Sequence, residues 1–166
     1  MAQGIVVRRV KASDADDMAA FINRFLTGQA KIDRQRIIER FGSVGFMLAE
    51  WNGKLVGTLG WRAENLVVRV SDLLIGSVPD RVAVGRALLA EMEQAAIELQ
   101  CEVVLLFLPR PTSPRLVEFC RTLGYEPQVV ASLPQAWREA AREVQLGDDE
   151  TLLIKELRSG RVFRPL

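Results

Sequence analysis

The sequence predicts an α/β fold with a mixed, largely antiparallel sheet and helices on both faces. Apolar runs flank Asn52 and Gly53, and this dipeptide predicts a β-hairpin because it favours the positive φ angles of a tight turn. The unbroken apolar run 103–108 is typical of a strand buried on both faces. It follows a long stretch with the apolar spacing of a helix. At 166 residues the chain is expected to form a single domain, 1–166.

The pattern of apolar, capping and turn residues predicts the order and the bounds of the helices and strands. Ser13 is expected to begin the first helix, with Asp16 as the acid of a capping box, and Asp33 is expected to cap the second helix. The helix at 134–144 is an addition to the regular order, and the tail at 158–166 carries no predicted element. The expected bounds are a strand at 5–10, helices at 13–28 and 33–41, a meander of strands at 46–51, 55–61 and 66–75, a helix at 80–99, a strand at 103–108, a helix at 114–123, a strand at 125–133, a helix at 134–144 and a strand at 151–157.

One stretch, from Leu73 to Leu89, combines an apolar strand end, a Gly/Ser/Pro turn and a helix start rich in small residues. The first backbone N–H groups of a helix lack partners within the helix, and the helix dipole favours an anion beside them. Gly85 has no Cβ, so a ligand can approach the backbone closely there. The stretch is therefore a candidate site for a phosphorylated cofactor.

Composition excludes several classes of function. The formal net charge is +1, which argues against a nucleic-acid partner or an acidic membrane surface. The sequence has no histidine, which removes Ser-His and Cys-His catalysis and the commonest metal ligand, so no metal site is predicted. Two cysteines and no secretory signal predict a cytoplasmic protein with reduced thiols, and no apolar run is long enough to span a bilayer.

The order of elements from residue 5 to 157 resembles the GNAT superfamily of N-acetyltransferases. Leu73 to Leu89 is similar to that family's pyrophosphate segment, usually Arg/Gln-x-x-Gly-x-Gly/Ala before Arg-Ala-Leu. Ser113 to Tyr125 is similar to its later segment, Asn-x-x-Ala-x-x-Leu-Tyr-x-x-x-Gly-Phe. The resemblance implies acetyl-CoA as cosubstrate and transfer of its acetyl group to a primary amine, on a small molecule or a peptide, within a ternary complex. The alternative is a catalytically silent module that binds CoA or dimerises.

The resemblance also implies a set of cofactor-binding residues in the strand end and helix start. Aligned without gaps, Asp80 occupies the family's Arg/Gln position and Ala83 its first Gly position, so the motif is degenerate. A one-residue shift would instead place Arg81 at the family's basic position. Asp80 suits a helix N-cap, yet its charge would repel a phosphate by about 3 kcal/mol at about 5 Å and a dielectric near 20. Arg81 and Arg86 could offset that charge. The implied cofactor-binding residues are Leu74, Ile75, Arg81, Val82, Ala83, Val84, Gly85 and Arg86.

Catalytic candidates follow from the same comparison. Cys120 stands where the family has a tyrosine that protonates the leaving thiolate, and a thiol with a pKa of about 8.5 could do so. Its alternative is a small apolar residue in the core, and Tyr125, at the family's Phe position, is expected to pack. Without histidine, the amine proton is left to a carboxylate or to a relayed water, and Glu64 and Asp72 are the reachable carboxylates. Each is otherwise an ordinary solvated or paired carboxylate. The sequence leaves the acceptor open, and a homodimer is compatible with it.

Overall fold

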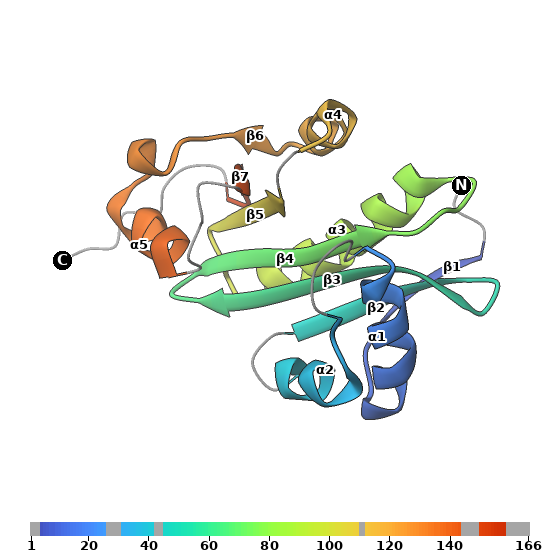
Figure 1. Cartoon of the computed structure of the whole chain (residues 1–166). Helices are drawn as coiled ribbons and strands as arrows, with labels where there is room; N and C mark the ends of the chain where they lie inside the picture. The colour runs from blue at the N-terminus through green and yellow to red at the C-terminus, as the bar shows by residue number, and fades with distance from the viewer. Residues whose placement is uncertain (1–3, 26–30, 42–44, 110–111, 144–149, 159–166) are drawn as a thin grey trace. The chain divides into compact units, whose positions relative to one another are not determined.

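The computed structural model describes residues 4–25, 31–41, 45–109, 112–143 and 150–158. Its strands pair in the order β1-β2-β3-β4-β5-β7-β6, with β4 and β5 parallel (Figure 1). This mixed, mostly antiparallel sheet with accompanying helices confirms the predicted fold class. The elements are β1 (Ile5–Arg9), α1 (Ala15–Asn23), α2 (Arg34–Phe41), β2 (Gly45–Trp51), β3 (Lys54–Glu64), β4 (Val67–Ile75), α3 (Arg81–Glu98), β5 (Val103–Pro109), α4 (Pro114–Thr122), β6 (Glu126–Pro127), α5 (Gln135–Glu143) and β7 (Glu150–Glu156).

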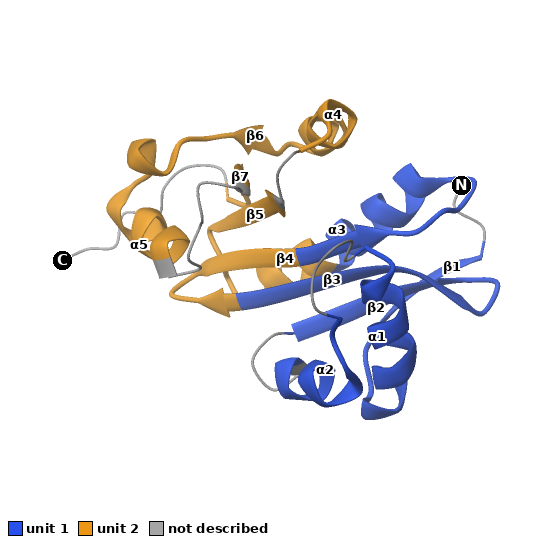
Figure 2. Ribbon diagram, in the orientation of Figure 1, with its two compact units in different colours: residues 1–62, 72–91 blue, residues 63–71, 92–166 orange. Residues whose placement is uncertain are grey.

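The chain divides into two compact units (Figure 2). Unit 1 contains residues 1–62 and 72–91, and unit 2 contains residues 63–71 and 92–166. Strand β4 and helix α3 each contribute residues to both units. Each unit has its own apolar core and its own polar network.

In unit 1, helices cover both faces of the strands. The face of β2 that carries Phe46 and Leu48 packs against α1 and α2 through Met18, Ile22 and Ile37. The opposite face carries Gly57 of β3, and there α3 approaches closely. A Cβ at Gly57 would lie 2.8 Å from Val84 Cγ1, closer than real Cβ contacts come, and 3.0 Å from Leu88 Cδ1, which is tighter than most. This glycine therefore allows the start of α3 to lie directly against the sheet.

In unit 2, β5 is the central strand. It pairs in parallel with β4 from Val67↔Val103 to Val70↔Leu106, and antiparallel with β7 along its whole length. Helix α5 covers one face of these strands, and the residues of 103–108 are all buried, as the apolar run predicts. The core under α5 consists of Val67, Val103, Leu105, Phe107, Leu133, Trp137, Ala141 and Leu152.

Two tight turns join β2, β3 and β4. Asn52 and Gly53 have φ angles of 51° and 77°, the positive values that a type I′ turn requires, so the predicted hairpin is confirmed. Asn65 and Leu66, with φ angles of 54° and 67°, form a second turn of the same kind. Leucine rarely adopts this conformation. The second turn therefore depends on its surroundings more than on its own sequence.

The predicted start of the first helix is wrong by two residues, since the sequence pattern places it at Ser13 and α1 begins at Ala15. A 3₁₀ turn at Ala12–Asp14 precedes α1, and the backbone N–H of Lys11 donates to Asp14 Oδ2 at 2.7 Å. Asp14, rather than Asp16, therefore supplies the capping acid. Helix α1 ends at Asn23, so Phe25 lies beyond it and is 39% exposed. Met18, Phe21 and Ile22, with which Phe25 shares a helical spacing in the sequence, are buried.

The predicted strand at 125–133 is also wrong. Pairing with β7 covers only Glu126 and Pro127, because proline has no N–H to extend the ladder. Gln128 then donates its N–H to the carbonyl of Leu152 at 3.0 Å, and a 3₁₀ turn follows at Val130–Ser132. Val129, whose β-branched side chain favoured a strand, is 71% exposed.

The helices predicted at 134–144 and 80–99 are both present, but the second differs from its prediction at its end. The helix predicted at 134–144 is present as α5, within the described residues. The helical spacing of apolar residues in 80–99 predicts a buried stripe of Val84, Leu88, Met92, Ala95 and Leu99. Val84, Leu88 and Met92 are buried, but the end of α3 buries Ala96 and leaves Leu99 54% exposed. No helix in the described part of the chain is both long enough and apolar enough to cross a membrane.

Adding a methyl group at Gly57 is expected to destabilise the protein by about 1–3 kcal/mol, because the methyl would overlap α3 side chains. Gly57→Ala should lower the midpoint of urea unfolding, and Val84→Ala, which removes the nearest methyl, should restore part of the loss in the double variant. Strictly additive losses in the two single variants would contradict this packing.

A second stabilising contact lies at the start of the chain. Arg8 donates to both carboxylate oxygens of Asp14 at 2.8 Å and, through Nε, to Glu50 Oε1 at 2.6 Å. These hydrogen bonds join β1, the 3₁₀ turn and β2. The bond from Arg8 is the main cause that lowers the pKa of Asp14 below its ordinary value.

Because the pKa of Asp14 is lowered in the folded state, this carboxylate stabilises the protein above its unfolded pKa of about 3.9. The stabilisation should disappear as the pH falls through the lower, folded value. Asp14→Asn should therefore cost about 1 kcal/mol at pH 7 and little in strong acid. Urea unfolding at a series of pH values measures this, and a cost independent of pH would exclude the ionic contribution.

Candidate functional site

The segment between β4 and α3 is fixed at both ends. The backbone N–H of Gly76 donates to the carbonyl of Val56 at 2.8 Å, so the chain leaves β4 still bonded to β3. A Cβ at Gly76 would lie 3.2 Å from Phe21 Cε2, which makes glycine the residue that fits here. The turn that follows ends at Asp80, directly before α3.

Asp80 caps helix α3, as predicted. Its Oδ1 accepts the backbone N–H of Ala83 at 3.0 Å, and its carbonyl accepts the N–H of Val84 at 3.3 Å. The guanidinium of Arg81 turns back and donates to the carbonyl of Ile75 at 3.3 Å. The N–H of Ala83 thus already has an acidic acceptor, which a phosphate would have to share or displace.

All eight predicted cofactor-binding residues belong to this one segment of unit 1. Arg81, Val82 and Arg86 are exposed at the start of α3, whereas Val84 and Gly85 are buried. Since the Val84 side chain points into the core at Gly57, only its backbone is available to a ligand. The segment therefore offers two arginine side chains and helix-start amides.

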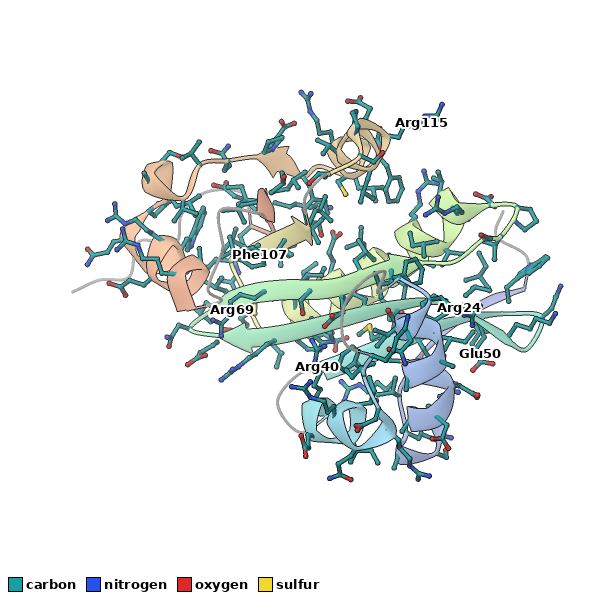
Figure 3. The ribbon with its side chains drawn as sticks, in the orientation of Figure 1. Arg24, Arg40, Glu50, Arg69, Phe107 and Arg115 are labelled. Carbon is teal, nitrogen blue, oxygen red and sulfur yellow. The ribbon has the colours of Figure 1, made fainter. Side chains whose placement is uncertain are left out.

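Asp72 occupies an irregular position within β4. Its φ angle is 54°, which interrupts the extended backbone of the strand. Its carbonyl accepts the hydroxyl of the fully buried Thr58 at 3.0 Å, and its Oδ2 accepts a hydrogen bond from Arg40 of α2. Arg40 is labelled in Figure 3. Arg40 also lies 5.5 Å from the centre of the Phe46 ring. Helix α2 is thus bonded to the irregular point of β4.

Glu64 lies at the end of β3, in unit 2. Its Oε2 accepts a hydrogen bond at 3.0 Å from Arg69, which is labelled in Figure 3. Arg69 is 8% exposed and also donates to the carbonyl of Ala140 at 3.3 Å. The Glu64 side chain is 45% exposed. Both predicted bases therefore have an arginine partner, and accepting an amine proton would compete with that hydrogen bond.

Cys120 is fully buried in α4. Burial raises the pKa of its thiol to about 11, so Cys120 is a protonated thiol at neutral pH. Tyr125 is also fully buried, as packing predicts, and its hydroxyl donates to Glu93 Oε2 at 3.0 Å. Among the described residues, no group of three or more His, Cys, Asp or Glu is placed to hold a metal ion.

Comparison with known proteins identifies the family. The model of the acetyltransferase (GNAT) family matches residues 15–125, more than half of the chain. The chain belongs to the GNAT family. It is an acetyltransferase that uses acetyl-CoA, and the matched range contains both the segment before α3 and helix α4. No curated protein matches the sequence.

Several solved structures share the GNAT fold with this chain. A GNAT acetyltransferase from Staphylococcus aureus Mu50 has a TM-score of 0.72 and 18% identity, over 93% of this chain and 99% of that one. A Salmonella typhimurium protein solved with acetyl-CoA has a TM-score of 0.68 and 14% identity, over 96% and 98%. The N-acetylglutamate synthase of Neisseria gonorrhoeae, with coenzyme A and N-acetyl-glutamate, gives 0.70 and 17%, over 93% of this chain but only 35% of the synthase.

Sequence analysis missed the partners of the predicted GNAT site residues. Arg40, Thr58 and Glu93 carry no motif, and each meets its partner only after folding. For Lys155, the other partner of Glu93, the sequence does carry a signal. Lys155 is two residues after Leu153 in β7, so the two side chains lie on the same face of the strand, and Leu153 is buried in the core. Strand periodicity therefore places the charge of Lys155 on a buried face.

The contact between Arg40 and Asp72 should show as coupling in a double-mutant cycle of stability. Because Arg40 is 36% exposed, the coupling is expected to be only about 1 kcal/mol. The variants are Arg40→Met, Asp72→Asn and their combination, measured by urea unfolding. Arg34→Met, on the same helix with a 58% exposed side chain, is the control and should cost little. Additive effects of the two changes would show that the pair is not coupled.

Proposed function

We propose that this GNAT protein transfers the acetyl group of acetyl-CoA to a primary amine, on a small molecule or a peptide, by direct attack in a ternary complex. The observation that supports this most is the segment Leu74 to Arg86. It joins a strand end to a helix start within the range that the family model matches. When bound, acetyl-CoA supplies an activated acetyl thioester.

The residues that would bind the diphosphate of the coenzyme are those at the start of α3. Backbone N–H groups of residues 81–83 and the side chains of Arg81 and Arg86 would provide the donors and the positive charge, since the N–H of Val84 already donates to the Asp80 carbonyl. Gly85 leaves room beside the backbone. Asp80 opposes binding in two ways, because its carboxylate repels phosphate and occupies the N–H of Ala83. The motif is thus degenerate at Asp80 and Ala83.

In the reaction, the amine nitrogen forms a bond to the acetyl carbon and the carbon–sulfur bond breaks. The candidates to take the amine proton are Asp72 and Glu64, and the candidate to protonate the leaving thiolate is Cys120. Full burial of Cys120 and the raised pKa of its thiol oppose that donor role. Asp72 lies in the same unit as the diphosphate segment, and its side chain is 20% exposed. Positioning of the reactants supplies most of the acceleration, with proton transfer second.

Thermal unfolding with added acetyl-CoA tests the binding site. A ligand at 100 times its Kd stabilises the native state by about 2.7 kcal/mol, so saturating acetyl-CoA should raise Tm by several degrees. Gly85→Glu should abolish the shift, whereas Cys120→Ala should keep it. No shift of the unmodified protein at millimolar acetyl-CoA would overturn the proposal.

Asp80→Asn tests whether the charge of Asp80 opposes coenzyme binding, because asparagine keeps the capping oxygen and removes the charge. It should tighten binding of acetyl-CoA by at least about tenfold, since removing the charge removes up to about 3 kcal/mol of repulsion, part of which salt already screens. Asp33→Asn is the matched control, as Asp33 Oδ1 caps α2 by the same bond to the N–H of Arg36, at 2.9 Å. Equal affinities in the Asp80 variant and the unmodified protein would show that the diphosphate lies elsewhere.

Thiol release from acetyl-CoA across a panel of primary amines tests the chemistry. Of Asp72→Asn and Glu64→Gln, the variant that removes the base should lose activity while retaining the acetyl-CoA shift. A Tm shift without thiol release for any amine would favour the silent CoA-binding module. The occupation of the Ala83 N–H by Asp80 is the observation on the side of that alternative.

A further inference from the structure

Three side chains of unit 2, from three separate elements, form one polar network. Lys155 of β7 donates from Nζ to Glu93 Oε1 at 2.6 Å, and Tyr125, after α4, donates from its hydroxyl to Glu93 Oε2 at 3.0 Å. The Lys155 ammonium also lies 5.5 Å from the centre of the Tyr125 ring. Tyr125 is fully buried, and the side chains of Glu93 and Lys155 are 16% and 28% exposed.

The network is balanced in charge and in hydrogen bonds. Each carboxylate oxygen of Glu93 has its own donor, and one negative charge faces one positive charge. Such a pair stabilises a fold when it is complete, but loss of one partner leaves a desolvated charge without compensation. Losing Lys155 should therefore do more damage than losing the hydroxyl of Tyr125.

The network is continuous with the end of helix α4. Gly124, at a φ of +96°, donates its N–H to the carbonyl of Arg121 at 3.0 Å, and Tyr125 donates its N–H to the carbonyl of Cys120 at 3.1 Å. This pair of bonds is the Schellman ending of a helix. A Cβ at Gly124 would lie 3.3 Å from Lys155 Cε. Tyr125 thus joins Cys120 through its backbone and Glu93 through its side chain.

We propose that Glu93, Tyr125 and Lys155 are positioning residues that fix the end of α4 and thereby keep the Cys120 thiol in its buried place. The proposal deepens the proposed function, and its catalytic consequence rests on the role of Cys120 there. The three residues act through Cys120 and do not touch the reacting atoms. Tyr125 itself is a poor proton donor, because burial and the nearby Glu93 carboxylate raise its pKa far above the ordinary value and its hydrogen is already donated.

The test is the rate at which iodoacetamide alkylates Cys120 in the folded full-length protein, followed by mass spectrometry of each cysteine. Tyr125→Phe removes one hydroxyl and keeps the ring, so the chain should still fold. It should raise the rate at Cys120 by about tenfold, because loss of a hydrogen bond to a charged group makes local opening of α4 easier. Lys155→Met should raise it further, and Lys155→Arg, which keeps a donor, should restore protection.

Cys101 is an internal control, since it is buried in the same unit at 2% exposure but lies outside the network. Gly57→Ala is the control for stability, because it weakens the fold in unit 1. Glu91→Gln is the control for helix charge, being exposed on α3. The proposal is supported if Tyr125→Phe and Lys155→Met raise the alkylation rate of Cys120 but not that of Cys101, and if neither control variant raises the rate at Cys120. Equal increases at both cysteines, or no increase at Cys120, would overturn it.

Acetyl transfer supplies the second readout. If Cys120 donates the proton, Tyr125→Phe should lower kcat while the KM for acetyl-CoA stays the same, and a loss of stability alone would not produce this separation. Failure of the proposed function is recognised separately, by an absence of thiol release in the unmodified protein. The alkylation result remains decisive for the positioning role in that case.

Discussion

The close approach of α3 to the sheet at Gly57 is the constraint on which the candidate site depends. Because glycine occupies this point of β3, Val84 and Leu88 can lie against the strand, and the first turn of α3 is fixed beside the end of β4. The bond from Gly76 to Val56 fixes the other end of the connecting turn. The helix-start amides are therefore held by packing before any ligand arrives, which lowers the entropic cost of binding.

The same helix start carries an acidic cap. Asp80 stabilises α3 by accepting the N–H of Ala83, and this is the group that an anion would also use. Arg81 donates one hydrogen bond to the carbonyl of Ile75, and the other N–H groups of its guanidinium can bind a ligand. Affinity for a diphosphate depends on how these charges balance. Stability of the helix and strength of coenzyme binding are here in direct competition.

Short-range patterns predicted the fold well. The Asn52 and Gly53 turn, the Asp80 cap and the buried strand β5 each follow from a few neighbouring residues. The strand prediction at 125–133 failed because two local patterns compete there. The β-branched residues at 129–130 favour a strand, whereas Pro127 interrupts one. The sequence also could not give contacts between distant residues. Arg40 and Asp72 are 32 positions apart, and Glu93 and Lys155 are 62 apart, so only the folded chain brings them together.

A crystal structure grown with coenzyme A tests the central claim most directly, namely that the backbone at the start of α3 binds the diphosphate beside an acidic cap. The account predicts phosphate oxygens within hydrogen-bond distance of N–H groups in residues 81–83, with Arg81 or Arg86 turned toward them. A coenzyme bound at another place, or crystals grown with saturating coenzyme A in which this site stays empty and Asp80 still accepts the Ala83 N–H, would contradict it.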